Sequence, residues 1–373
     1  MLTPSLLFSR HSKLANALQQ SGLDAVAVNP GPSLTYLTGL HFHTSERPVV
    51  LLFAPGKTPA LVLPELETRK VDHPLFELQV FPYGENPLDW VKAFAGAAYA
   101  VGLPGARVGV EARRMRVLEV HYLEEAAAGA RFIPAEETFA ALRMYKDAAE
   151  AETMRRAADV GQKALIATLP LIKLGMTEKD LAGELVIQLL RQGSSPAMPF
   201  SPIVSFGPNS ANPHASPTER KLAPGDLLLF DWGATVDDYY SDITRTFAVG
   251  EVEPEYVKIA AIVKQANEAG RAAAKPGVPC SAVDKAARGV IEKAGYGQYF
   301  THRTGHGLGM DGHEEPYMRG DNEQLLEPGM VFTVEPGIYL PDRAGVRIED
   351  DVMITEGGAE SFTDLPRELI RAL

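Results

Sequence analysis

The stretch that decides the fold of this chain is LLLFDWGATVDDYYSDITRTFAV, residues 227–249. The apolar run at 227–230 predicts a strand, and residues 239–249 predict its partner strand across a turn. Each strand carries an acid in an apolar setting, Asp231 and Asp242, and on paired strands these can face one another. Because a buried carboxylate without a partner is costly, the two acids indicate a site where something positive neutralises them.

A second pair of apolar runs repeats this arrangement further along the chain. Residues 330–335 end in Glu335, and the run at 345–354 contains Arg347 and Glu349. Side chains alternate between the two faces of a strand, so Arg347 and Glu349 are expected on one face. The chain therefore has two hairpins, each with two acids at strand positions.

The four acids carry as much negative charge as two divalent cations carry positive charge. A water molecule bridging two such ions, about 3.5–4 Å apart, ionises near neutral pH and becomes a strong nucleophile. The pattern therefore predicts a two-metal hydrolase. The alternative is that the acids are solvated turn charges or ion-pair partners of Arg245 and Arg347.

Histidine residues give a third indication of a metal site. The segment THRTGHGLGMDGHEEP, residues 301–316, holds His302, His306 and His313. Glycines on both sides of His306 permit close backbone approach, which favours functional roles for His306 and His313, whereas a structural role is favoured for His302. His214 lies in a loop rich in Gly, Pro and Asn. The glycine-rich run lacks the strand–GxGxxG–helix context of a nucleotide-binding loop.

The composition is that of a globular protein and disfavours several classes of partner. The 373 residues are 45% apolar and 23% charged, with a formal net charge of -12 at pH 7. An acidic chain is a poor binder of nucleic acid, and no run approaches the roughly 20 apolar residues of a membrane span. Residues 1–20 lack the apolar core of a signal peptide. A single cysteine, Cys280, fits a reducing cytoplasm and is expected to be structural.

Two domains are expected from the pattern of helices and strands. Residues 1–142 predict a smaller α/β domain in which a helix at 9–21 precedes apolar runs that predict strands, at 25–28, 34–37, 49–53, 60–63 and 108–110. Residues 143–373 predict a larger domain whose helices lie at 147–168, 177–192, 253–274 and 281–294. There, two helices followed by a strand pair occur twice, so the fold class is α/β (α+β) with an internal structural repeat.

At this point the motifs resemble those of a known family. The segments are SFGPNSANPH at 205–214, DWG at 231–233, SDITRT at 241–246, GHGLG at 305–309, HEEP at 313–316, VEPG at 334–337 and VRIED at 346–350. Together they resemble the M24 metallopeptidases (M24B), and within these the Xaa-Pro dipeptidase (prolidase) and aminopeptidase P branch. The segment PGPSLTYLTG at 30–39 resembles the start of the creatinase-type N-terminal domain, which methionine aminopeptidases lack.

This resemblance implies a fold and a metal site. The fold would be a C-terminal "pita-bread" catalytic domain with a smaller creatinase-like N-terminal domain, commonly in a homodimer. Two divalent ions would be held by five side chains: Asp231 on one ion, Asp242 and Glu349 bridging both, and His306 with Glu335 completing the shell of one ion. None of these is missing, which argues against the creatinase-like members that lost their metals and against a non-catalytic binding protein.

The resemblance also implies hydrolysis of the peptide bond before proline by attack of a metal-bridging hydroxide. That bond is a tertiary amide without an N–H, and its departing nitrogen must be protonated. Glu335 is expected to act as the proton shuttle, and His214 and His313 to hydrogen-bond the substrate and the intermediate. Arg347 is expected either to orient the acids or to form a structural ion pair, and Thr244 to donate to a ligand.

Two substrate classes and several metals stay open. A dipeptidase must satisfy the free carboxylate of an Xaa-Pro dipeptide, for which Arg319 is a candidate, whereas aminopeptidase P acts on longer peptides with proline at the second position. The dipeptidase is the first choice. One imidazole among four carboxylates makes a hard ligand set, which favours Mn2+ or Co2+ while Zn2+ stays possible.

Overall fold

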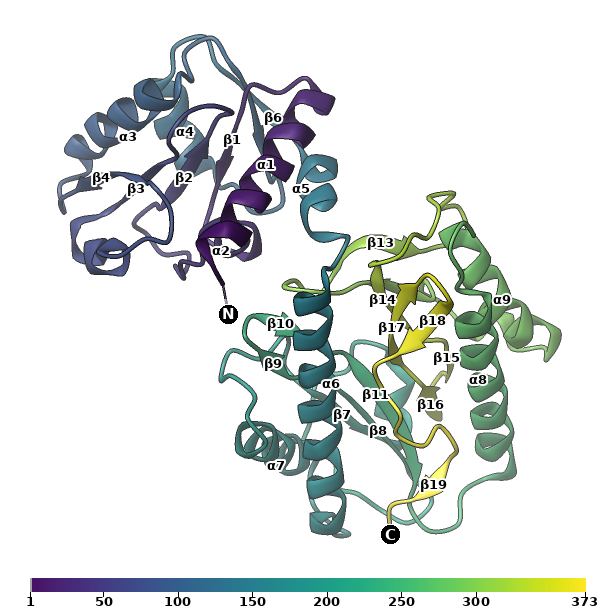
Figure 1. Ribbon diagram of the computed structural model, residues 1–373. Coiled ribbons are helices and arrows are strands. Elements are labelled where there is room, and N and C mark those ends of the chain that lie inside the picture. The colour runs from purple at the N-terminus through teal and green to yellow at the C-terminus, as the bar shows by residue number, and fades with distance from the viewer. Residues whose placement is uncertain (1) are drawn as a thin grey trace. The chain divides into compact units, whose positions relative to one another are not determined.

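A computed structural model describes residues 2–373 of the protein. The chain divides into two compact units, the first ending at Arg143 and the second spanning Met144–Leu373 (Figure 1). Within the described residues, no helix combines the length and the apolar character that crossing a membrane requires.

The first unit is a six-stranded mixed sheet covered by helices. The strands have the order β4-β3-β2-β1-β5-β6, with bounds β1 (Ala25–Val28), β2 (Val50–Phe53), β3 (Ala60–Pro64), β4 (Gln79–Tyr83), β5 (Arg107–Val110) and β6 (Arg131–Pro134). The helices are α1 (Pro4–Ser21), α2 (Pro32–Thr38), α3 (Pro87–Val101), α4 (Val117–Ala126) and α5 (Glu136–Arg143), with a 3-10 helix at Glu65–Val71. Strand β1 pairs antiparallel with β2 and parallel with β5, so the sheet is mixed.

The strand expected at residues 34–37 is wrong, because these residues belong to helix α2. Pro32 stands at the start of that helix, where its fixed φ suits the first turn. Gly39 ends the helix in the left-handed conformation, at φ 72. A four-residue apolar run cannot distinguish a buried strand from one buried turn of helix, and the flanking Pro and Gly decide between them.

Helix α3 supplies much of the core of the first unit. Phe94 is fully buried against the sheet and stacks on Tyr122, with ring centroids 5.3 Å apart. Tyr99, one turn later on the same helix, is 81% exposed. The two aromatic residues therefore make a matched pair for measuring what burial contributes.

We expect Phe94→Ala to lower the free energy of unfolding of the first unit by about 3–5 kcal/mol, because it leaves a cavity in a packed core. The matched Tyr99→Ala change should stay within about 0.5 kcal/mol, since it removes a solvated ring. Urea unfolding followed by circular dichroism measures both. Equal costs for the two variants would contradict this description of the core.

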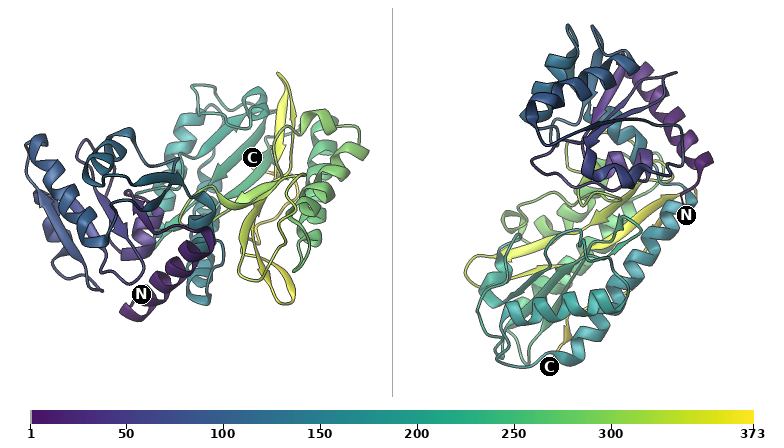
Figure 2. Two further views of the ribbon diagram at one scale, coloured as in Figure 1. Left: turned by 90° about the horizontal axis from the view of Figure 1, so that it is seen from above. Right: turned by 90° about the vertical axis from the view of Figure 1, so that its left-hand side faces the viewer.

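The second unit contains two helix pairs and two main sheets. The helices are α6 (Ala148–Thr168), α7 (Glu178–Arg191), α8 (Pro254–Ala273) and α9 (Cys280–Lys293), with 3-10 helices at Leu169–Leu171, Gly207–Ala211 and Gly297–Tyr299. Figures 1 and 2 show the pair α6 and α7 on one side of the strands and the pair α8 and α9 on the other. The expected repeat of two helices followed by strands is present in this unit.

Apart from β19 at the end of the chain, the strands of each main sheet of the second unit follow one helix pair. One sheet has the order β19-β11-β8-β7 and the other β13-β12-β14-β17-β18. Two short two-stranded sheets, β10-β9 and β15-β16, complete the unit. The strands of all four sheets are β7 (Ile203–Phe206), β8 (Leu227–Trp232), β9 (Thr235–Val236), β10 (Tyr239–Tyr240), β11 (Ile243–Ala248), β12 (Gly305–Gly307), β13 (Glu314–Met318), β14 (Val331–Val334), β15 (Gly337–Leu340), β16 (Ala344–Arg347), β17 (Asp350–Thr355), β18 (Gly358–Ser361) and β19 (Ile370–Arg371).

Two of the expected strands are interrupted, and both interruptions hold an acid. The strand expected at 239–249 breaks between β10 and β11, at Ser241 and Asp242. The strand expected at 345–354 breaks between β16 and β17, at Ile348 and Glu349, because β16 pairs with β15 whereas β17 pairs with β14. The second hairpin is therefore two hairpins in different sheets, a division that an unbroken apolar pattern does not reveal.

Candidate metal centre

A cavity of about 960 Å³ in the second unit brings the candidate residues together. Its lining includes all five candidate metal ligands, Asp231, Asp242, His306, Glu335 and Glu349. It also includes the four candidate substrate-facing or orienting residues, His214, His313, Arg319 and Arg347. Thr244 is the one candidate outside the lining, and it contacts Glu349 from behind.

The tightest group of candidate ligands is Asp242, His306 and Glu349. One ligand atom from each lies within 4.8 Å of the others. The Nε2 atom of His306 is 3.7 Å from Asp242 Oδ2 and 3.4 Å from Glu335 Oε1. One imidazole nitrogen thus faces carboxylate oxygens from two different sheets, an arrangement that fits a divalent cation.

Asp231 reaches the cavity from strand β8, directly opposite Thr244 on β11. Its Oδ2 accepts a hydrogen bond from Arg347. Its Oδ1 is buried and accepts none within residues 2–373. Buried polar atoms nearly always have a partner, so this oxygen is suited to a metal ion.

Glu349 is fixed by the strand that carries Asp242. Its backbone N–H donates to Thr244 O at 3.1 Å, and the Thr244 hydroxyl donates to Glu349 Oε2 at 2.6 Å. This pair is an isolated bridge between the two main sheets. Asp242 precedes β11 and Glu349 precedes β17, so the bridge sets the separation of the two acids.

The glycine at position 305 allows the backbone beside His306 to lie against Thr333, which brings His306 close to Glu335. A Cβ atom on Gly305 would lie 1.8 Å from the carbonyl oxygen of Thr333, so only glycine fits there. The His306 N–H donates to the Thr333 hydroxyl at 3.2 Å, and that hydroxyl donates to Glu335 Oε1 at 3.3 Å. The Thr333 hydroxyl on β14 therefore contacts both candidate ligands, His306 on the neighbouring strand β12 and Glu335 just after β14.

Burial dominates the electrostatics of the candidate ligands. Burial, followed by repulsion from Glu349 and Asp231, raises the pKa of Asp242 well above its ordinary value. Burial and repulsion from Glu335 and Asp231 do the same to the pKa of Glu349. Burial raises the pKa of Glu335 to about 7, and burial lowers that of His306 well below 6.5. Carboxylates so placed gain most from a cation, and a neutral imidazole is the form that binds one.

The alternative reading of the acids as solvated turn charges is wrong for the described structure. Asp231, Asp242 and Glu349 are 8%, 5% and 2% exposed. The ion-pair reading holds for Asp231 alone, which pairs with buried Arg347. Arg245 pairs with Asp350 instead. Of the arginines that line the cavity, Arg347 pairs with one of the four acids, so much of their charge is left for another partner.

The other histidines singled out from the sequence, His214, His302 and His313, line the same cavity, as does Arg319. The ring of His313 contacts that of His306, with centroids 4.0 Å apart, and both His313 and His214 are exposed. Arg319 is exposed and pairs with Asp321, its Nε 3.1 Å from Oδ1. His302 has well-defined structural contacts, to Tyr339 Oη at 2.8 Å and to the Arg303 carbonyl oxygen at 2.7 Å.

Sequence reasoning missed three residues that hold this site. Arg347 donates to Tyr339 Oη at 2.9 Å, so Tyr339 joins Arg347 to His302. Both carboxylate oxygens of Asp351 accept the backbone N–H of Asp242, at 3.2 Å. Asp350 anchors a separate network of arginines. The one available signal was the run of three acids after Ile348, which is unusual within an apolar strand pattern.

The fold and the cavity fit a metal-dependent hydrolase, and comparison with known proteins gives its family. Residues 152–356 match the model of Metallopeptidase family M24, and residues 10–145 match that of the Creatinase/Prolidase N-terminal domain. The chain belongs to metallopeptidase family M24 and is a metal-dependent peptidase. The expected pita-bread catalytic domain with a creatinase-type N-terminal domain is thereby confirmed, and the reading as a non-catalytic binding protein is set aside.

Similar proteins span nearly the whole chain. A protein of Bacillus subtilis named "Putative dipeptidase YkvY" is 36% identical over 365 residues, which is 97% of this chain and 99% of that protein. The crystal structure of a recombinant prolidase from Thermococcus sibiricus is 35% identical, with a TM-score of 0.90 over 97% of this chain and 98% of the other. That of an X-Pro aminopeptidase from Thermotoga maritima is 29% identical, with a TM-score of 0.84 over 97% and 99%.

We expect Mn2+ to raise the melting temperature of chelator-treated protein, and to raise it more at about pH 7.5 than at about pH 5, because ions and protons compete for the same carboxylates. A carboxyl whose pKa rises on folding stabilises the folded state at low pH. That contribution is lost as the pH rises from 4.5 toward about 7 for Glu335. Over this range an added cation replaces the lost protons.

Differential scanning fluorimetry at the two pH values, with and without Mn2+, measures this effect. Mg2+-free buffer with chelator alone is the control at each pH. A shift in melting temperature that is equal at both values, or larger at the lower one, would contradict the competition.

Proposed function

We propose that this chain is a dinuclear-metal exopeptidase that hydrolyses the Xaa-Pro peptide bond, first of all in Xaa-Pro dipeptides. The observation that carries this proposal is the convergence of Asp242, His306 and Glu349 within 4.8 Å, with Glu335 beside them. Relatives named dipeptidase and a similar structure titled prolidase support the substrate class. No single motif would suffice, since the fold serves several activities.

The proposed ligands divide the metal site between two ions. Asp231 would bind one ion, Asp242 and Glu349 would bridge both, and His306 with Glu335 would complete the shell of one. Bound divalent ions supply a water molecule acidified to near neutral pH and a Lewis acid for the scissile carbonyl. Four carboxylates with a single imidazole favour Mn2+ or Co2+ over Zn2+.

The chain's own residues orient the acids and move a proton. Glu335 is proposed to take a proton from the attacking water and to deliver it to the proline nitrogen, which cannot leave as an anion. Arg347 holds one oxygen of Asp231, and Thr244 holds one oxygen of Glu349. Each acid would thereby keep its other oxygen for an ion, which is how such hydrogen bonds tune a metal site.

Three exposed residues at the cavity are proposed to bind substrate. His214 and His313 would donate to the scissile carbonyl oxygen and to the tetrahedral intermediate, where negative charge develops. Arg319 would bind the free carboxylate of a dipeptide. The location of Arg319 in the lining of the same 960 Å³ cavity as the candidate ligands supports this role.

We further propose that the protein acts as a homodimer in the cytoplasm. The family resemblance supports the dimer, and a sequence with the single cysteine Cys280 suits a reducing compartment. Analytical ultracentrifugation tests the first point, since a dimer has twice the chain mass of 40.3 kDa.

Parallel assays with Ala-Pro and Ala-Pro-Ala distinguish the two substrate classes. A dipeptidase is expected to hydrolyse Ala-Pro at least about tenfold faster per unit concentration, because the carboxylate contact is worth at least about 1.4 kcal/mol in the transition state. Arg319→Gln should raise KM for Ala-Pro more than it changes kcat. Cleavage of the tripeptide alone would support aminopeptidase P activity instead.

Asp242→Asn is expected to lower kcat by at least about a hundredfold, because it removes the charge of a bridging ligand. Asp237→Asn is the matched control, since Asp237 lies in the β9–β10 turn, where its exposed carboxylate pairs with Arg156. Circular dichroism should show both variants folded. Near-normal turnover by a folded Asp242→Asn protein would contradict the assignment.

A further inference from the structure

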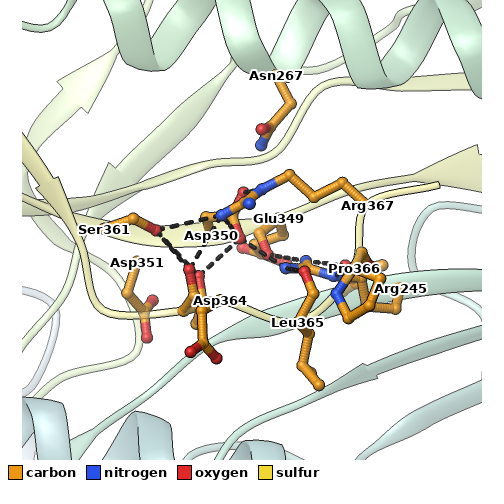
Figure 3. A network of polar contacts seen from close by, with 12 residues as sticks. Arg245, Asn267, Glu349, Asp350, Asp351, Ser361, Asp364, Leu365, Pro366 and Arg367 are labelled. Carbon is orange, nitrogen blue, oxygen red and sulfur yellow. Dashed lines mark hydrogen bonds and ion pairs between the residues drawn. The ribbon is translucent and has the colours of Figure 1, made fainter.

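The acid that follows Glu349 is the centre of a buried network on which the end of the chain converges (Figure 3). Asp350 has no exposed surface. Its Oδ1 accepts from Arg245 Nη2 at 2.7 Å and from the Thr363 hydroxyl at 2.6 Å. Arg367 donates through two nitrogens, from Nε to Oδ2 at 2.8 Å and from Nη2 to Oδ1 at 3.0 Å. Bidentate contacts of this kind are strong and geometrically specific.

Arg245 joins this network to the bridge between the two sheets. Its Nη1 donates to the carbonyl oxygens of Thr244 at 2.8 Å and of Glu349 at 2.7 Å. Its Nε donates to Pro366 O at 3.0 Å, and its Nη2 donates to Leu365 O at 3.1 Å. One guanidinium therefore contacts both strands of the bridge and the terminal segment of the chain.

The same residues are adjacent in the chain to three candidate metal ligands. Asp350 directly follows Glu349, and in the β14–β17 ladder it lies opposite Val334, the residue before Glu335. Arg245 lies three residues after Asp242 on the adjoining strand. Displacement of Asp350 would thus be transmitted to ligands in both sheets.

We infer that residues 363–367, here called the tail clamp, position the metal ligands through Asp350 and Arg245. This inference rests on the proposed metal centre and adds a role for a segment outside the cavity. Arg245, and Arg271 at 3.6 Å, would still face Asp350 after loss of Arg367, but a buried carboxylate that loses its bidentate partner must shift or take up water to satisfy its oxygens. Arg245 contacts both Asp350 and the carbonyl oxygens of Thr244 and Glu349, so a shift of Asp350 reaches the ligand set through this bridge.

A purely structural ion pair predicts a different result from a positioning role. Loss of a structural contact lowers the melting temperature of metal-free protein and leaves ion binding by the folded protein unchanged. Loss of a positioning contact weakens ion binding at temperatures where the variant is fully folded. Ion affinity of the folded protein therefore separates the two.

The test is isothermal titration of Mn2+ into chelator-treated Arg367→Gln protein, well below its melting temperature. We expect binding about tenfold weaker than in the unaltered protein, as for other residues that orient metal ligands. Arg367→Lys keeps the positive charge but loses the paired donation from two guanidinium nitrogens. This variant is expected to bind Mn2+ more tightly than Arg367→Gln and less tightly than the unaltered protein. The visible absorption of bound Co2+ is expected to change in the glutamine variant.

Arg371→Gln is the matched control, because Arg371 belongs to the same terminal segment but pairs with Glu251 at the surface. It should bind Mn2+ as the unaltered protein does. Equal affinity and an unchanged Co2+ spectrum in folded Arg367→Gln protein would overturn the tail clamp. Failure of the unaltered protein to bind Mn2+ would instead overturn the proposed function.

Thr363→Val keeps the test decisive if Arg367→Gln does not fold. It removes one hydroxyl that donates to Asp350 Oδ1 and leaves the volume nearly unchanged. We expect weaker Mn2+ binding by this variant, by a smaller factor than in the glutamine variant. Unchanged affinity in folded Thr363→Val and Arg367→Lys proteins would also overturn the inference.

Discussion

The catalytic unit depends on one electrostatic constraint, the mutual repulsion of four carboxylates at a single cavity. Asp231 lies on β8, and Asp242 directly precedes β11 of the same sheet. In the other sheet, Glu335 directly follows β14 and Glu349 directly precedes β17. Arg347 is the buried cation that faces them, and it contacts only Asp231 among the four through its side chain. The repulsion therefore acts across the junction of the two sheets. The acids of the two sheets can lie this close only if further positive charge or protons lie between them.

That junction is narrow. The two sheets meet at the Thr244–Glu349 bridge, where a backbone hydrogen bond and a hydroxyl contact lie within the same residue pair. Arg245 donates to the carbonyl oxygens of both residues, so the bridge has a cation on its outer side as well. Arg245 thus compensates the acids from outside the cavity, whereas Arg347 lines the cavity and pairs with Asp231.

The sequence singled out residues that the structure brings to one cavity, but it predicted the strands that carry them less well. An acid within an apolar run is a strong signal, because burial of charge needs a reason, and this identified all four carboxylates. The helix at 32–38 was missed because a short apolar run has no measurable period. The break at Ile348 and Glu349 was missed because it arises from pairing with two different partners, β15 and β14. The network of Asp350 was also beyond local patterns, since the two arginines that donate hydrogen bonds to it lie 105 residues before it and 17 after.

The three successive acids Glu349, Asp350 and Asp351 explain why one of them is suited to a metal. Three arginines face Asp350, namely Arg245, Arg271 and Arg367, and although burial opposes it, the charge of Arg245 and the contacts of Arg367 lower its pKa. Burial raises the pKa of Asp351, whose oxygens are occupied by the N–H of Asp242. Burial and repulsion raise the pKa of Glu349, whose compensation is a single hydroxyl and the distant charge of Arg347. Asp350 has its counter-charge within the protein and Asp351 faces a backbone amide. Of the three acids, Glu349 alone combines largely uncompensated charge with access to the cavity. It is therefore the acid suited to bind a metal, because Asp350 already pairs with arginines and Asp351 already accepts a backbone N–H.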